Sequence, residues 1–272
     1  MAQRSDPQGD KTVAPYGTWA SPISVESLTE GAVSIGEVIP EDNALWWSQS
    51  RPDQGGRTAI MRHQNGEITE VTPGDANVRT LVHEYGGGAW WVHAGVCYYV
   101  DFTDQRIRSL VPGQTPQLLS PEPPTPRGLR YADFRLTEDG LWLIAVEERW
   151  TKDAGEPANT LVAVATDGSM RKVTLASGAD FYHSPRLSPD GTQLCWIEWQ
   201  HPNMPWDDTT LQLADIRFKG ESPTLGPAQT VAGGQDEAVV QPLWSPGGTL
   251  HYLSDRSDNW QVYALGSDSA VT

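Results

Sequence analysis

Residues 184–199 read SPRLSPDGTQLCWIEW, and this stretch decides the fold. A short apolar segment leads into the turn at 188–191, and a strand-like run follows at 194–199. Pro189 presets φ for a turn, and Gly191 supplies a positive φ without steric cost. The β-branched and aromatic residues of the run suit a pleated, half-buried surface. The stretch therefore predicts a β-hairpin.

Hairpins of this kind recur along the chain at a steady spacing. The related stretches are VIPEDNALWWSQSR, GGGAWWVHAGVCYYVD, DFRLTEDGLWLIAVEER and QPLWSPGGTLHYLSDR. If Leu45, Val96, Leu141, Leu194 and Leu250 are equivalent, the repeat steps are 51, 45, 53 and 56 residues. A period of this length predicts a repeat architecture.

Each repeat continues into a second pair of strand-like runs around a polar turn. In the first repeat these runs are TAIMRH and EITEVTP, separated by Gln64-Asn65-Gly66. Four strands per repeat are typical of a β-propeller, whose four-stranded sheets stack around an axis because one such sheet cannot bury both faces alone. A β-sandwich or an up-and-down barrel is the alternative, but a sandwich does not predict SPDG-type turns alternating with NG- or DG-type turns at a steady period. We therefore predict an all-β fold, a β-propeller.

The predicted propeller occupies residues 16–272 and ends within a repeat. Its blades are expected at roughly 30–75, 76–122, 123–178, 179–238 and 239–272, of which the last is partial. Four complete repeats and part of a fifth suggest an incomplete ring, the leading part of a larger propeller. Alternatively, the stretch before Val38 supplies a missing strand to the fifth blade and closes a small ring.

The composition limits the possible partners. The chain carries 35 Asp and Glu against 19 Lys and Arg, a formal net charge of −16. We therefore exclude nucleic acid and anionic membranes as partners, because a binder of either needs a concentrated basic surface. No stretch approaches the roughly 18 consecutive apolar residues of a membrane helix.

The first residues show no targeting signal. Residues 1–15 mix charge, Pro and Gly without an apolar core, so we expect a disordered leader and no secretory signal. In the stretch 21–28, Ser24 is a candidate N-cap of a short helix. Cys97 and Cys195 each lie in an apolar run, which favours two buried, reduced thiols in a cytoplasmic protein.

The titratable side chains carry no metal or cofactor signature. The histidines show neither H-x-x-x-H nor H-E-x-x-H spacing, so we predict no metal and no cofactor. Asp101, Asp104 and Asp133 occupy predicted turn positions, where a hydrogen bond to the local backbone is the expected role.

Two longer blocks carry a family resemblance. They are VRTLVHEYGGGAWWV at 78–92 and DFYHSPRLSPDGTQLCWIEWQHPNMPWDDTTL at 180–211, supported by SRPDQGGRTAI at 50–60. These blocks resemble the N-terminal propeller of the prolyl oligopeptidase family of serine peptidases, in its acylaminoacyl-peptidase and dipeptidyl-peptidase-like branch. The SPDG hairpin alone is also similar to the repeats of TolB-like proteins. The resemblance covers nearly the whole chain from Val13 onward.

The resemblance implies an α/β-hydrolase domain, normally in the same chain, with its serine nucleophile in a G-x-S-x-G turn. No G-x-S-x-G occurs in this sequence, so we assign no catalytic residue. The resemblance thus implies a non-catalytic propeller that covers the active site of a hydrolase domain, restricts access to peptide substrates and contributes part of the pocket. The alternative is a self-contained propeller that acts as a binding or scaffold module.

His83, Glu84 and Tyr85, followed by three glycines, form the most unusual local run. Consecutive glycines allow positive φ and a close approach of another group. One interpretation is a loop at the mouth of the propeller that faces the hydrolase domain, where Glu84 meets a substrate amine. The other is a connection between blades whose glycines make room for Trp90 and Trp91.

The block HPNMPWDD interrupts the fourth repeat where a short turn is expected. Two prolines and a tryptophan make a stiff loop that can present a side chain. His201, Asn203, Trp206 and Asp207 are therefore candidates for lining the substrate chamber or docking the partner domain. The alternative is that His201 and Asp207 satisfy backbone groups of the loop while Trp206 caps the blade.

Overall fold

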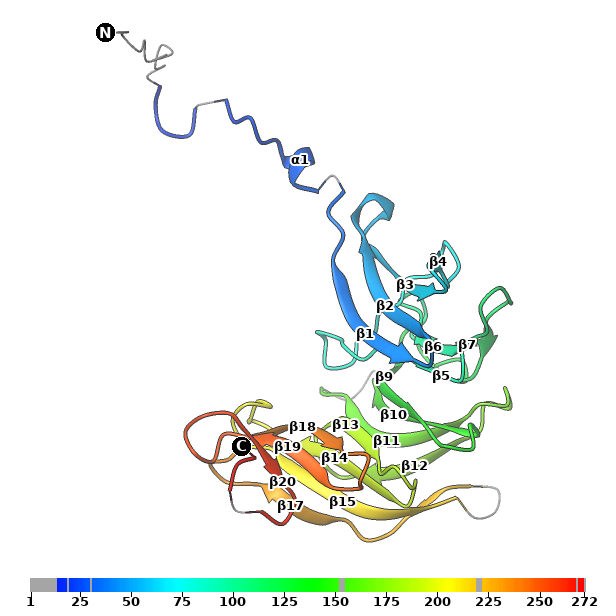
Figure 1. Ribbon diagram of the computed structural model, residues 1–272, viewed down its shortest axis with the longest axis vertical. Coiled ribbons are helices and arrows are strands. Elements are labelled where there is room, and N and C mark those ends of the chain that lie inside the picture. The colour runs from blue at the N-terminus through cyan, green and yellow to red at the C-terminus, as the bar shows by residue number, and fades with distance from the viewer. Residues whose placement is uncertain are drawn as a thin grey trace.

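The computed structural model describes residues 14–18, 20–29, 31–151, 155–218, 222–267 and 269–271. Most of the leader predicted at 1–15 lies outside the described residues. The one α-helix in the described part, α1 (Val25–Thr29), is capped as predicted: Ser24 Oγ accepts a hydrogen bond from Ser27 N at 3.0 Å. In Figure 1, α1 lies on the N-terminal segment, apart from the sheets.

The remaining chain forms five antiparallel sheets within the described residues, one after another in sequence. Blade 1 consists of β1 (Ile35–Glu41), β2 (Ala44–Arg51), β3 (Arg57–Gln64) and β4 (Glu67–Glu70). Blade 2 consists of β5 (Trp90–His93), β6 (Val96–Val100), β7 (Ile107–Leu110) and β8 (Gln117–Leu118). Blade 3 consists of β9 (Leu129–Leu136), β10 (Trp142–Arg149), β11 (Ala158–Ala165) and β12 (Lys172–Ser177).

The last two blades differ from this pattern. Blade 4 consists of β13 (Phe181–Leu187), β14 (Gln193–Trp199), β15 (Thr210–Arg217), β16 (Thr224–Leu225) and β17 (Gln229–Gly233), with both β16 and β17 paired to β15. Blade 5 consists of β18 (Val239–Trp244), β19 (Leu250–Ser254) and β20 (Gln261–Ala264). Figure 1 shows blades 1 and 2 above and blades 3 to 5 below. The all-β propeller predicted from the repeats is confirmed.

The turn at 188–191 forms the predicted hairpin between β13 and β14. β13 and β14 pair with Leu187 opposite Leu194, and Gly191 in the intervening turn has φ +67°. Asp190 Oδ1 accepts hydrogen bonds from Ser188 Oγ at 2.6 Å and from Thr192 N at 3.1 Å. The matching turn of blade 3 uses Asp139 in the same way. Blades 3 and 4 therefore share the hydrogen bonds of this turn as well as the order of their strands.

The blades are held together by apolar clusters between neighbouring sheets. One joins blades 3 and 4 and includes Ile144 and Leu161 from blade 3 with Leu194 and Trp196 from blade 4. Corresponding clusters join blades 1 and 2, blades 2 and 3, and blades 4 and 5. The first strand of each blade contacts the first strand of the next, along the series β1, β5, β9, β13 and β18. These first strands therefore surround the axis of the propeller.

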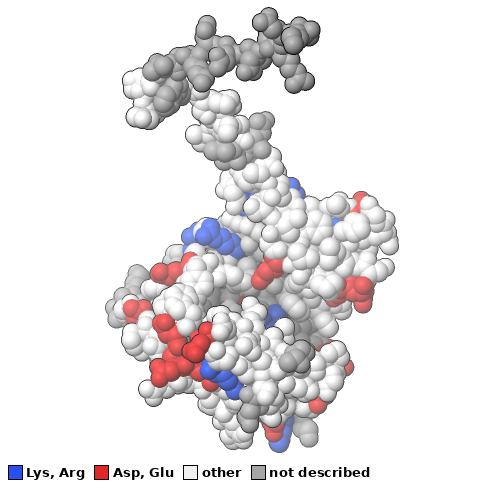
Figure 2. All heavy atoms as spheres, turned by 60° about the vertical axis from the view of Figure 1, so that its left-hand side comes forward, with Lys and Arg blue, Asp and Glu red and all other residues white. Residues whose placement is uncertain are grey.

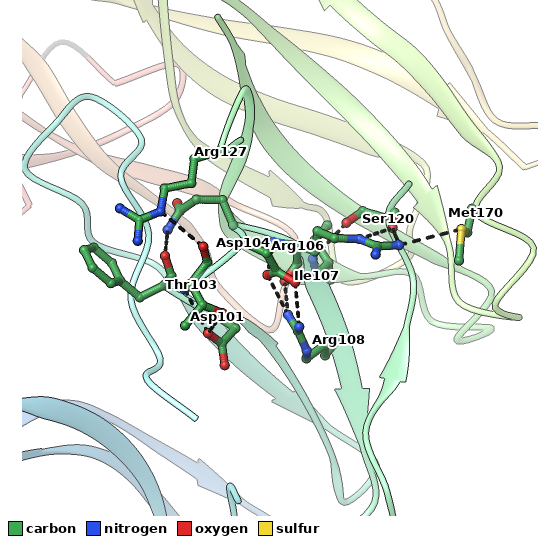
Figure 3. A network of polar contacts seen from close by, with 11 residues as sticks. Asp101, Thr103, Asp104, Arg106, Ile107, Arg108, Ser120, Arg127 and Met170 are labelled. Atoms are coloured by element: carbon green, nitrogen blue, oxygen red, sulfur yellow. Dashed lines mark hydrogen bonds and ion pairs between the residues drawn. The ribbon is translucent and has the colours of Figure 1, made fainter. Parts of the chain in front are cut away.

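A polar network fixes the loop between β6 and β7 (Figure 3). Asp101 Oδ1 accepts a hydrogen bond from Thr103 N at 2.9 Å, and Asp104 Oδ1 accepts one from Arg106 N at 3.0 Å. Asp104 also binds both terminal nitrogens of Arg108, at 2.9 and 2.7 Å. The predicted role of the two aspartates in the local backbone is confirmed.

The two cysteines and the helices also agree with the sequence. Cys97 and Cys195 are both buried free thiols, as predicted. Among the described helices, none has the length and apolar character needed to cross a membrane.

Substitution of two repeat-equivalent leucines tests the blade packing. Leu194 is fully buried between blades 3 and 4, whereas Leu141 is 58% exposed. Leu194→Ala should lower the free energy of unfolding by about 2–5 kcal/mol, because a cavity remains in the inter-blade core. Leu141→Ala should change it by about 0.5 kcal/mol or less. Urea unfolding measures both values, and equal losses would contradict the assigned packing.

Candidate functional site

The two motifs singled out in the sequence meet at one cleft of about 750 Å³. Its walls come from the segment between β4 and β5, the β10–β11 connection and the β14–β15 connection. The first segment contributes His83, Glu84 and Tyr85, and the last contributes Met204 and Pro205. The ring geometry thus brings together motifs that lie more than a hundred residues apart.

Aromatic rings form one wall of the cleft. Phe181 stacks on Trp199 with ring centroids 4.9 Å apart and an interplanar angle of 12°. The ring of His83 lies edge-on to each of these two rings, with centroids 5.5 Å apart. His201 packs against the Phe181 ring at 4.7 Å. Such a wall offers π faces to an apolar or cationic ligand group.

A buried carboxylate, Glu148 of β10, anchors the loop at 83–88. Glu148 is 1% exposed. Its Oε2 accepts a hydrogen bond from His83 N at 2.8 Å, and its Oε1 accepts one from Trp150 Nε1 at 2.6 Å. Arg130 forms an ion pair with the same Oε1 at 2.6 Å. The buried charge is therefore paired and fully hydrogen-bonded, as a carboxylate at this depth requires.

Burial also sets the charge state of the cleft. Burial, reinforced by interaction with His183 and opposed by Asp133, lowers the pKa of His83 to about 4. The Nε2 of His83 is buried without a hydrogen-bond partner in the described part of the chain. His83 is therefore a neutral, aromatic wall residue at neutral pH.

Unlike Glu148, which is buried and paired with Arg130, Glu84 faces the solvent. Its side chain is exposed, and it forms no ion pair with any residue that the structure describes. His83 and Glu84 have φ of +54° and +66°, the left-handed region that non-glycine residues rarely adopt. The cleft thus has two exposed carboxylates that form no ion pair with a described residue, Glu84 beside the aromatic wall and Glu156 in the β10–β11 connection. Such a carboxylate attracts a cation.

The glycines of this loop allow close backbone approach. A Cβ at Gly86 would lie 2.7 Å from the carbonyl oxygen of Thr80, and one at Gly88 would lie 2.9 Å from the backbone nitrogen of Asp133. The loop does connect blades 1 and 2. The atoms nearest to these two glycines are backbone atoms of Thr80, in the same connection, and of Asp133, in β9, and not the rings of Trp90 and Trp91.

The loop at 200–209 is stabilised by its own side chains. Asp207 Oδ2 accepts a hydrogen bond from Met204 N at 2.9 Å, and Asn203 Nδ2 donates to Asp208 Oδ2 at 3.3 Å. Trp206 is 61% exposed, so the expectation that it caps the blade is wrong. His201, Asn203, Trp206 and Asp207 are not among the described residues that line the cleft, although the His201 ring packs against Phe181, which does line it.

Sequence reasoning missed several residues of the site. Glu148, Trp150, Phe181 and Trp199 all belong to the cleft. A charged residue inside the apolar run LIAVEERW was the available signal for Glu148. Among the described residues, no three His, Cys, Asp or Glu side chains are grouped so as to hold a metal ion.

Asp133 was assigned to a turn from the sequence, and this prediction is wrong. It lies within β9 at an irregularity in the pairing with β10, and it has φ +62°. Its carboxylate reaches the next blade, where Oδ2 accepts a hydrogen bond from Ser184 N at 2.7 Å and Oδ1 pairs with Arg186 Nη1 at 3.3 Å. A polar residue at a β-bulge resembles a turn in sequence.

Comparison with protein-family models and with curated proteins gave no match. Solved structures do match. A puromycin-hydrolyzing peptidase of Mycobacterium tuberculosis is 32% identical, with a TM-score of 0.84 over 95% of this chain and 41% of that one. A puromycin hydrolase is 31% identical, with a TM-score of 0.85 over 96% of this chain and 42% of that one. This chain therefore spans about two fifths of their length.

A more distant match shows the fold alone. Prolyl oligopeptidase B from Galerina marginata is 10% identical, with a TM-score of 0.60 over 89% of this chain and 38% of that one.

Two neighbouring glycines test the close approach of the loop to blade 3. Gly87 has φ +108° with open space at its Cβ position, whereas Gly88 has φ +61° and faces the Asp133 backbone. Gly87→Ala should cost about 1–3 kcal/mol of backbone strain. Gly88→Ala should cost about 1–3 kcal/mol more, because Asp133 must move. Thermal and urea unfolding of the two variants measure the difference, and equal costs would show that the contact tolerates a methyl group.

The lowered pKa of His83 predicts a pH dependence of stability. A histidine in the unfolded chain binds a proton near pH 6.5, whereas His83 in the folded protein does so only at about 4. Between these values the unfolded state binds more protons, so the free energy of unfolding falls as the pH falls. His83→Gln should make this fall shallower by up to about 3 kcal/mol across the window.

The matched control is His63→Gln, which replaces an exposed histidine of β3 and should keep the wild-type profile. Unfolding in urea at a series of pH values between about 4 and 7 supplies the measurement. Parallel profiles for wild type and His83→Gln would rule out a half-buried, neutral His83.

Proposed function

Because the chain is a β-propeller of the prolyl oligopeptidase family of peptidases, we propose that it is the non-catalytic, substrate-admitting part of a serine peptidase that acts on peptides. The support is its similarity to two puromycin-hydrolysing proteins together with a cleft built from the two motif loops. Assignment to the acylaminoacyl-peptidase and dipeptidyl-peptidase-like branch stays a prediction from those motifs.

The proposed catalytic partner is an α/β-hydrolase domain. No G-x-S-x-G occurs in the sequence, so a serine nucleophile in such a turn comes from outside these 272 residues. Apolar side chains stand exposed at the cleft and on its loop, namely Tyr85, Met204 and Trp206. Exposed apolar groups beside a cleft suit a domain interface, and a domain seated there would limit access to the cleft to small peptides. Two buried free thiols suit a reducing compartment, so we place the protein in the cytoplasm.

One observation carries the proposed substrate class: the exposed carboxylate of Glu84 lines the same cleft as the Phe181–Trp199 stack. A carboxylate attracts an ammonium group, and aromatic faces add cation–π attraction and apolar contact. A peptide with a free N-terminal amine and an apolar first side chain offers both groups. Glu84 would then bind the ammonium group, and the stacked rings would contact the side chain.

Puromycin is a direct probe of this proposal. It carries a free α-amine on an aromatic amino-acid moiety, and the matched structures are named for its hydrolysis. Glu84→Gln should weaken puromycin binding at least about tenfold, because a charge-assisted hydrogen bond is lost. N-acetylpuromycin, which lacks the ammonium group, should bind wild type and Glu84→Gln equally. Titration calorimetry on the 272-residue chain measures these affinities.

Glu138→Gln is the matched control, since Glu138 is an exposed acid on the blade 3 turn outside the cleft. Equal binding of puromycin and N-acetylpuromycin by wild type would overturn the role of Glu84. The puromycin should also be recovered intact. Hydrolysis that is blocked by a serine-directed inhibitor would place catalysis on this chain and overturn the non-catalytic function.

A further inference from the structure

A second hollow lies on the propeller axis, separate from the aromatic cleft. Its volume is about 260 Å³, and it has no lining residue in common with the cleft. The first strands of blades 1 to 4 all contribute to it. The space-filling view shows both basic and acidic atoms at the central hollow of the molecule (Figure 2).

The repeat explains which side chains face this hollow. Gly88, Asp133 and Ser184 occupy equivalent positions near the axis, with φ of +61°, +62° and +52°. For Asp133 and Ser184 the pairing register shifts at this point, which marks a β-bulge. Bulges re-aim the side chains that follow them. The residues two positions later all line the hollow: Trp90, Arg135 and Arg186.

The two arginines have unequal partners. Arg186 forms its ion pair with Asp133, whose other oxygen is used by Ser184 N. Arg135 forms no ion pair with a described residue; its Nη1 donates to the carbonyl oxygen of Phe134 and its guanidinium lies 3.9 Å from the Trp91 ring centroid. Burial, with repulsion from Arg186, lowers the pKa of Arg135 to about 9. The guanidinium of Arg135 thus lacks a direct counter-charge.

The hollow also holds N–H donors without acceptors. Arg186 Nε and Trp90 Nε1 are buried and have no hydrogen-bond partner in the described part of the chain. The other carboxylate in the hollow is Glu37, whose Oε1 accepts a hydrogen bond from Gly88 N at 3.3 Å. Burial and the charge of Asp133 raise the pKa of Glu37, so it gives up its charge more readily than an exposed glutamate. Two N–H donors of the hollow therefore lack an acceptor among the described residues, and Arg135 lacks a direct ion pair.

We propose that this axial hollow binds a carboxylate, held between the guanidinium groups of Arg135 and Arg186. A carboxylate offers about four lone-pair sites, and guanidinium groups bind it with two parallel hydrogen bonds. The ligand would supply the counter-charge that Arg135 lacks. The indole rings of Trp90 and Trp91 and the side chains of Val38 and Ile39 would surround its apolar part. The site is independent of Glu84 and of the peptide N-terminus.

N-acetylglycine and N-acetylglycinamide test the site on the unaltered chain. Both lack the ammonium group that Glu84 would bind, and only the first carries a carboxylate. The probe signals are the indole N–H resonances of Trp90 and Trp91, assigned with Trp→Phe variants. N-acetylglycine should shift both resonances, and the amide should bind at least about tenfold more weakly. Equal shifts from the two compounds, or none from N-acetylglycine, would overturn the proposal.

Three variants locate the site further. Arg135→Met should weaken N-acetylglycine binding at least about tenfold, and Glu37→Gln should strengthen it because a competing charge is removed. Arg62→Met is the matched control: Arg62 also lies over an indole ring, that of Trp46, but outside the hollow. It should bind N-acetylglycine like wild type. If Arg135→Met bound N-acetylglycine as tightly as wild type, Arg135 would not hold the carboxylate.

Discussion

The hydrogen bond from Asp133 N to Gly88 O, 2.8 Å long, is the constraint on which the centre of the propeller depends. It joins the axial strand of blade 3 to the start of blade 2, where a side chain at Gly88 would collide with the Asp133 backbone. The Asp133 carboxylate then accepts a hydrogen bond from Ser184 N of blade 4. Hydrogen bonds at Gly88, Asp133 and Ser184 thus link three successive blades.

The same constraint shapes both sites. Gly88 ends the loop whose other end is held by the bond from His83 N to Glu148. A loop fixed at both ends can keep Glu84 in the left-handed region, since the surrounding contacts determine its conformation. On the axial side, the bulge places Arg135 two residues after Asp133 and in the hollow. The irregularity at Asp133 therefore bears both on the loop that lines the cleft and on the arginine that lines the hollow.

Local chemistry was predictable from the sequence, whereas contacts between blades were not. The turn at 188–191 follows from Pro, Asp and Gly acting within four residues, and Ser24 caps α1 for the same local reason. The meeting of His83 with Phe181 depends on how blades 2 and 4 are arranged around the axis, which no local pattern encodes. Asp133 was misassigned because a single polar residue in an apolar strand signals a turn as readily as a bulge. Only the pairing register distinguishes them.

The net charge of −16 acts differently on the two proposed sites. An acidic surface raises the local concentration of cations, so it would favour the approach of an ammonium group to Glu84. It repels carboxylates over the same range, and salt at physiological strength screens both effects beyond about 8 Å. A carboxylate at the axial hollow must therefore be bound by short-range hydrogen bonds from the half-buried Arg135 and Arg186. Its affinity would then depend weakly on ionic strength, whereas the rate of amine capture at the exposed Glu84 would fall as salt is added.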